Sequence, residues 1–166
     1  MYDIAIGRSF LLVCSTFPQG LFIGKLQPQH LQLVLAHWHY QDQENTKDYI
    51  GSMIKNYHNA AVFQVDDPTK PVGWVMQHPF GQLGHEYVLE EHRGTKLSLL
   101  AKREVCNQII KDGDFPETCI VASNAVAAHL TRQAGFVDMG RGKVLAVGFN
   151  KAYMHGSSYI TQTKIS

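Results

Sequence analysis

The sequence is poor in cysteine and has no long hydrophobic run. Its three cysteines, Cys14, Cys106 and Cys119, are widely spaced and lie in apolar surroundings. An odd, scattered set is not a disulfide framework, so we expect reduced thiols that fill the core of an intracellular protein. No stretch approaches the roughly 20 apolar residues of a membrane-spanning helix, and the apolar run Phe10–Cys14 is short even for a signal peptide. The sequence therefore predicts no membrane partner.

An excess of charge of either sign is also missing. The 15 Lys and Arg residues and the 14 Asp and Glu residues leave a formal net charge of +1, and the basic residues are scattered along the chain. Nucleic-acid-binding surfaces need basic residues that gather in a patch, so we expect no nucleic-acid partner. With 166 residues, of which 45% are hydrophobic, the chain has the size of one domain with a proper core, and we expect residues 1–166 to form it.

Strand and helix patterns alternate along the chain without repeats. The apolar residues Leu31, Val34, Leu35 and Trp38, for example, recur at helical spacing after Pro28. Strands are predicted at Phe10–Cys14 with an extended Leu21–Leu26, and at Asn59–Val65, Pro71–Gln77, Leu83–Glu91, Thr118–Ala122 and Val144–Phe149; helices begin near Pro28, Thr46, Leu97 and Asn124. The order β-α-α-β-β-β-α-β-α-β predicts an α/β fold with a mixed central sheet and helices on both faces.

The segment from Tyr87 to Ser98 is a predicted strand that passes through an Arg-Gly turn into a helix. A helix that begins directly after a strand presents unpaired N–H groups and the positive end of its dipole, and Arg93 and Lys96 add formal charge there. The run matches neither a Walker A loop nor GxGxxG. We expect an anionic cofactor on this turn.

The turn resembles the pyrophosphate-binding motif Arg/Gln-x-x-Gly-x-Gly/Ala of the Gcn5-related N-acetyltransferase (GNAT) superfamily. Arg93 takes the first position, while Lys96 and Ser98 replace the glycine and the small residue. Residues 21–137 further resemble the C-terminal catalytic domain of the glycine N-acyltransferase family. The motifs that carry this likeness follow in the same order: Trp38-His39, Pro71-Val-Gly-Trp74, Arg93-Gly94, and Asn124 at a helix start.

This resemblance implies transfer of an acyl group from acyl-CoA or acetyl-CoA to the amine of a small amino acid such as glycine. The cofactor-binding residues that it implies on the turn are Val88, Leu89, Arg93, Gly94, Thr95, Lys96, Leu97, Ser98 and Leu99, with the pyrophosphate of CoA on the amides of residues 94–99. It implies that a backbone N–H near Val88 polarises the thioester carbonyl, and that Asn124 both caps a helix and contacts pantetheine. It places Trp38, His39 and Tyr40 on the acceptor side of the cleft. By family analogy the compartment is cytoplasmic or mitochondrial.

The general base is the point at which the sequence departs from the family. Gln82 stands where glycine acyltransferases carry a glutamate, and an amide cannot take a proton. His85 and Glu86 lie on the same strand with side chains on opposite faces. We favour His85 as the substitute base, because an unperturbed histidine pKa near 6.5 suits the task. Thr131 takes the position at which many GNAT enzymes carry a tyrosine acid.

Two other classes of function stay open. Gln82, Lys96 and Thr131 favour a GNAT-fold module that binds CoA weakly or not at all and acts through protein association. A polyamine or protein N-acetyltransferase would need an acidic acceptor groove. A metal site is not expected, because His37 and His39 point apart on a helix and lack a partner at ligand spacing.

Overall fold

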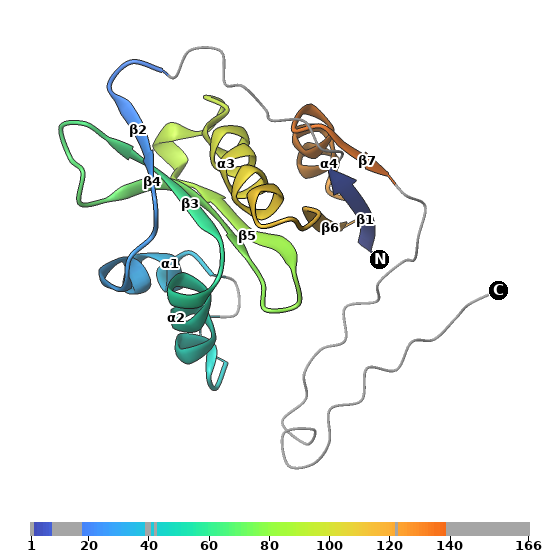
Figure 1. The fold of residues 1–166 in the computed structure, drawn as a ribbon. Helices are drawn as coiled ribbons and strands as arrows, with labels where there is room; N and C mark the ends of the chain where they lie inside the picture. The colour runs from blue at the N-terminus through green and yellow to red at the C-terminus, as the bar shows by residue number, and fades with distance from the viewer. Residues whose placement is uncertain (1, 8–17, 39–40, 42, 122, 139–166) are drawn as a thin grey trace.

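The computed structural model describes residues 2–7, 18–38, 41, 43–121 and 123–138. Within this part of the chain, strands form one seven-stranded sheet in the order β2-β3-β4-β5-β6-β1-β7 (Figure 1). All neighbouring strands are antiparallel except β5 and β6, which are parallel. The strands are β1 (Tyr2–Gly7), β2 (Leu21–Gly24), β3 (Asn59–Gln64), β4 (Pro71–Gln77), β5 (Gln82–Val88), β6 (Glu117–Val121) and β7 (Phe136–Asp138).

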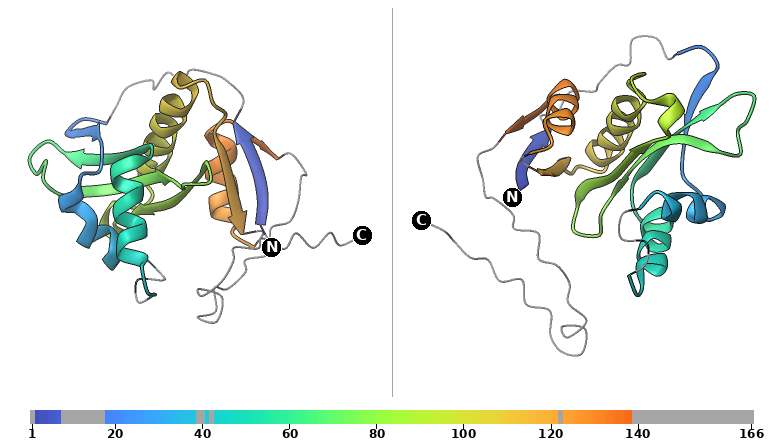
Figure 2. Two further views of the ribbon diagram at one scale, coloured as in Figure 1. Left: turned by 60° about the horizontal axis from the view of Figure 1, so that its bottom comes forward. Right: turned by 180° about the vertical axis from the view of Figure 1, so that it is seen from behind.

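Helices cover both faces of this sheet, as the sequence predicted. The helices α1 (Leu31–Ala36) and α2 (Thr46–Asn56) lie below strands β3 to β5 in Figure 1, and α3 (Leu97–Lys111) lies above them with α4 (Ala125–Gln133) beside it (Figures 1 and 2). Two 3-10 turns, Pro28–His30 and Glu90–His92, precede α1 and α3. None of the helices in the described residues is long and apolar enough to cross a membrane.

The core lies around β3 and β4, which are almost wholly buried along their length. Strands covered by helices on both faces read as continuous apolar runs, and this is why both segments are recognisable in the sequence. The antiparallel pairing of β3 with β4 confirms the predicted hairpin. Trp74 and Met76 of β4 and Ile109 of α3 are among the largest fully buried side chains.

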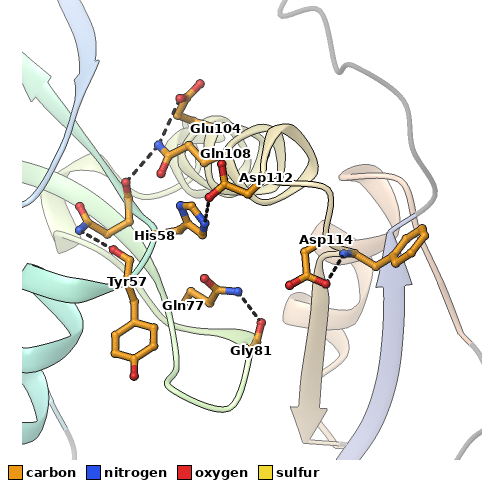
Figure 3. A network of polar contacts seen from close by, with 10 residues as sticks. Tyr57, His58, Gln77, Gly81, Glu104, Gln108, Asp112 and Asp114 are labelled. Carbon is orange, nitrogen blue, oxygen red and sulfur yellow. Dashed lines mark hydrogen bonds and ion pairs between the residues drawn. The ribbon is translucent and has the colours of Figure 1, made fainter.

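Polar contacts fix the second half of α3 to the start of β3. Gln108 Nε2 donates to the backbone oxygen of Asn59 at 3.2 Å and to Glu104 Oε1 at 3.2 Å. Nearby, His58 Nε2 lies 3.1 Å from Asp112 Oδ2 at the end of the helix (Figure 3). These contacts hold the axis of α3, so its N-terminus has a defined place above β5.

The structure adds two strands that the sequence analysis did not predict, β1 and β7. β1 inserts between β6 and β7 and pairs antiparallel with both. The predicted strands Phe10–Cys14 and Val144–Phe149 lie outside the described residues. The predicted strand Leu83–Glu91 is too long at its C-terminal end, because β5 ends at Val88 and Glu90–His92 form a 3-10 turn.

Candidate functional site

Strands β5 and β6 separate and open a cavity of about 760 Å³ between them. Their parallel pairing is confined to Gln82 with Glu117 and Leu83 with Thr118. On its other edge β5 carries an irregularity, because the register shifts between Trp74 and Met76 of the neighbouring strand. A register shift of this kind bends a strand away from its partner. The walls of the cavity come from β5, the turn before α3, α3 itself, β6 and α4.

The turn that leads into α3 lines one end of this cavity. Gly94 has a φ of 78° and Lys96, the N-cap of α3, has a φ of 61°. Left-handed backbone is costly for residues with a Cβ, so glycine would adopt this conformation at position 96 with less strain than lysine. Lys96 therefore precedes the helix as its N-cap, and α3 itself begins at Leu97.

The first turn of α3 offers free donors. Lys96 makes no side-chain cap, and its carbonyl oxygen accepts only from the later amides of Leu99 and Leu100. In the described part of the chain no protein acceptor takes the N–H of Leu97 or Ser98, and both residues line the cavity. Free N–H groups at the positive end of a helix fit a phosphate group well.

Arg93 lies beside these amides and folds back onto β5. Its Nε donates to the carbonyl oxygen of Val88 at 3.3 Å, and its guanidinium stands 5.6 Å from the centre of the Tyr87 ring. An Nη nitrogen also donates to the Tyr87 hydroxyl at 3.3 Å. The side chain remains 54% exposed, so the cation is pre-positioned at the mouth of the cavity and is still accessible to an anion.

Val88 closes β5 where its neighbour β6 has moved away. The N–H of Leu89 donates to Val72 on β4 at 2.9 Å. Because N–H groups alternate in direction along a strand, the amide of Val88 faces the opposite side, toward the cavity. It is therefore placed to donate to a bound carbonyl oxygen.

Seven of the predicted cofactor-binding residues line the cavity and three do not. Leu89 and Leu99 are buried in the core, with their amides bonded to Val72 and Lys96, and Thr95 bonds back to the carbonyl oxygen of His92. Those that line it are Val88, Arg93, Gly94, Lys96, Leu97, Ser98 and Asn124. Asn124 caps α4 as predicted, because its side chain accepts from the Ala127 amide at 3.0 Å; its contact with pantetheine stays a prediction.

His85 lies on the opposite face of β5, in a cluster of aromatic rings. It stacks on Trp38 at 3.6 Å between ring centres and is 7% exposed. The ring centre of His78 lies 4.9 Å from that of His85. The Nδ1 atom of His78 forms a hydrogen bond of 2.7 Å with the Tyr49 hydroxyl. Within the described part of the chain, neither ring nitrogen of His85 has a hydrogen-bond partner. His39 and Tyr40, which were predicted to join Trp38, lie outside the described residues.

Burial, reinforced by neighbouring His78, lowers the pKa of His85 to about 3. Burial likewise lowers the pKa of His78 to about 4. The value near 6.5 on which the choice of His85 as general base rested is therefore wrong for this site. A neutral imidazole with so low a pKa is a weak proton acceptor. Gln82, near the start of the strand, hydrogen-bonds Cys119, and burial raises the pKa of that thiol.

The sequence analysis missed a polar cluster on the cavity wall. Lys102 Nζ of α3 lies 2.8 Å from Glu86 Oε2 of β5 and donates to Thr131 Oγ1 of α4 at 2.9 Å. A signal did exist, because Lys102 falls on the apolar stripe of α3 between Ala101 and Val105. Among the residues whose placement is described, no three His, Cys, Asp or Glu side chains gather as metal ligands would.

Comparison with known proteins gives the fold a family context. Residues 62–142 match the model of the family described as FR47-like protein. The sequence matches no curated protein. Among solved structures, a Drosophila protein determined by a structural genomics consortium superposes with a TM-score of 0.73 at 18% identity, covering 82% of this chain and 47% of its own.

Two further structures are acetyltransferases. A GNAT-family acetyltransferase from Colwellia psychrerythraea has a TM-score of 0.63 at 15% identity, over 83% of this chain and 52% of that one. The spermidine/spermine N-acetyltransferase SpeG of Vibrio cholerae, in mutant form, has a TM-score of 0.56 at 14% identity, over 74% and 83%. The chain thus has the GNAT fold, and it spans about half the length of the Drosophila and Colwellia structures.

Proposed function

We propose that this domain transfers an acyl group from acyl-CoA or acetyl-CoA to the amine of a small molecule. The observation that carries the proposal is the cavity between β5 and β6, with the free amides of Leu97 and Ser98 and the cation of Arg93 at one end. These groups suit the pyrophosphate of CoA. The Val88 amide lies at the end of β5, which forms one wall of the cavity, and a thioester carbonyl bound there can accept its hydrogen bond.

The acceptor enters from the other face of β5 in this proposal. An amine that reaches the thioester there meets Trp38 and the rings around His85. The acceptor must lose a proton before it attacks. Since the low pKa of His85 makes it a weak base, we infer that the amine is deprotonated by solvent and that the site contributes mainly by positioning both substrates.

We propose glycine, or another small amino acid, as the acceptor. Support comes from the resemblance of residues 21–137 to the glycine N-acyltransferase family. A polyamine is the alternative small amine, since one structural neighbour is a spermidine/spermine N-acetyltransferase. The two acceptors differ in charge and length, so a direct comparison separates them.

The rival class is a module that binds CoA without catalysis. Gln82 in place of a carboxylate and the lowered pKa of His85 both favour it. Binding and turnover must therefore be measured separately.

The test has two arms. The first is a thermal shift with free CoA, acetyl-CoA and longer acyl-CoAs, since a ligand that prefers the native state raises stability by mass action. The second measures release of the CoA thiol in the presence of glycine or spermidine. Stabilisation together with amine-dependent thiol release supports the enzyme, and stabilisation without release supports the module. If no CoA species raises the melting temperature, the proposed function is wrong.

A further inference from the structure

Lys102 places a buried positive charge on the wall of the cavity. Its side chain is 2% exposed, and its Nζ contacts Glu86 Oε2 and Thr131 Oγ1. The three residues come from α3, β5 and α4, and all three line the cavity. Among the residues whose burial is described, Lys102 is the one buried Lys or Arg. The cation is therefore a built feature of this cavity.

Stability alone does not explain such a group. Taking two charges out of water costs several kcal/mol per ion, and apolar side chains of the same volume often replace a buried ion pair without loss. Perturbed or buried charges that face a cavity are instead typical of functional sites. Such a cation is placed to meet an anion bound in the cavity.

Among the residues whose placement is described, one anion contacts Lys102. That anion is Glu86; the thiols of Cys106 on α3 and Cys119 on β6 are kept neutral because burial raises the pKa of both, for Cys106 to about 12. On α4 the nearest contact is the neutral Thr131 hydroxyl. An ammonium carries three N–H groups, and the contacts of Nζ with Glu86 and Thr131 leave one for the cavity.

We propose that Lys102 holds the sulfur of CoA as it leaves the thioester. The inference rests on the proposed function, in which the acceptor amine attacks the carbonyl carbon. The C–S bond then breaks with its electron pair on sulfur, the acceptor nitrogen loses its proton to water, and the thiolate lies against Lys102 Nζ–H. Solvent protonates the sulfur after release, so Lys102 stays an ammonium throughout.

The position of Lys102 fits this role. Glu86, its partner, lies two residues before Val88 on β5, about 7 Å along the strand. The carbonyl oxygen and the sulfur of a thioester are bonded to the same carbon. When that oxygen accepts a hydrogen bond from the Val88 amide, the sulfur of CoA therefore lies near the part of the cavity wall that Lys102 forms. Glu86 and Thr131 are positioning residues, because they act on the sulfur through Lys102.

The ionisation of bound CoA tests the inference without any turnover. The thiolate absorbs in the ultraviolet and the thiol does not, so a pH titration of the CoA complex gives the thiol pKa. The wild type should lower that pKa by about one unit or more, a tenfold shift of the ionisation equilibrium. Lys102→Met combined with Glu86→Gln, which removes the whole pair and leaves no buried charge, should return it to the value of free CoA.

Glu86→Gln alone gives a prediction of opposite sign. It frees Lys102 from its carboxylate, so the thiol pKa should fall further than in the wild type. Lys111→Met, on the exposed end of the same helix, is the control and should match the wild type. Desulfo-CoA, which has no thiol, controls for titration of the protein.

The outcomes separate this inference from the proposed function. CoA that binds with an unshifted thiol pKa overturns the role of Lys102 and leaves the acyltransferase intact. A lowered thiol pKa without amine-dependent turnover supports Lys102 and contradicts the acyltransferase. If CoA does not bind, both fail. Should the double variant not fold, the single variant Glu86→Gln decides, since an unchanged or raised thiol pKa there contradicts the inference.

Discussion

A Cβ atom on Gly84 would stand 2.1 Å from Nε2 of His78. Real Cβ atoms do not approach other atoms so closely, so the ring of His78 occupies the space that any other residue at position 84 would need. The ring has little room to move, because its Nδ1 bonds the Tyr49 hydroxyl and its face stacks on Phe80. Gly84 thus lets two histidines gather beside β5.

We expect Gly84→Ala to destabilise the fold by about 1–3 kcal/mol, the usual cost of overpacking. The measurement is the free energy of unfolding in urea. His78→Ala and the double variant complete a cycle, and the loss in Gly84→Ala should be largely relieved when His78 is already shortened. Additive effects in the cycle would contradict the steric explanation.

At position 96, lysine should give a less stable fold than glycine. Its φ of 61° lies in the left-handed region, and relief of that conformation, less the entropy lost by glycine, predicts that Lys96→Gly gains about 0.5–1 kcal/mol. Lys96→Ala keeps the Cβ and should not gain. For CoA, Lys96→Gly should leave the affinity within about tenfold and reduce its salt dependence, since one cation is lost. An affinity a hundredfold higher would mean that the lysine blocks the site.

The buried histidines predict an acid-sensitive fold. Their folded-state pKa values, about 3 for His85 and about 4 for His78, lie below the value of about 6.5 in the unfolded chain. Between these limits the unfolded chain binds protons that the folded one excludes, so stability is complete above about pH 6.5 and falls as the pH drops toward 3. His85 has a φ of 48°, and Asn tolerates such left-handed backbone, so His85→Asn should flatten the slope by up to about 1.4 kcal/mol per pH unit. A slope unchanged in urea unfolding from pH 3 to 8 would show that His85 does not titrate this way.

The same pKa shapes the expected rate profile. Without a base of pKa near 6.5, acyl transfer to glycine should keep rising from pH 6 toward the pKa of the amine. His85→Asn should preserve that shape, while Gln82→Glu, which restores a carboxylate on β5, should raise turnover at neutral pH. A plateau near pH 6.5 that disappears in His85→Asn would establish His85 as the base. If wild type and both variants bind CoA and none transfers an acyl group, the binding module replaces the enzyme.

Local sequence pattern explains which parts of the fold could be predicted. The apolar runs of β3 and β4 and the periodic face of α3 each carry their own signal. β1 has no such signal, since it is defined by pairing with β6 and β7, more than a hundred residues farther along the chain. Strand pairing of that range is a tertiary property that a local window does not contain.

The candidate site likewise has features that local sequence predicts and features that only the fold reveals. Residue types alone located the turn of Arg93 and Gly94, because a basic turn before a helix is a local feature. The pKa of His85 depends on rings that come from other elements, Trp38 and His78 among them. The place of Lys102 on the apolar stripe of α3 was a local sign of its burial. Its partners Glu86 and Thr131 come from separate elements, so only the fold shows why a lysine is accommodated there.

The most direct test of the central claim is a calorimetric titration of acetyl-CoA into the wild type, Arg93→Glu and Lys70→Glu. Arg93 stands at the free amides of α3, and its reversal should weaken binding by about 1–3 kcal/mol, the scale of a lost charge-assisted hydrogen bond. Lys70, exposed in the turn between β3 and β4, makes the same change of net charge away from the cavity. We predict one acetyl-CoA per chain, with wild-type affinity in Lys70→Glu and at least about fivefold weaker binding in Arg93→Glu. Absence of binding to the wild type, or equal affinity in all three proteins, would contradict the assignment of this cavity to acyl-CoA.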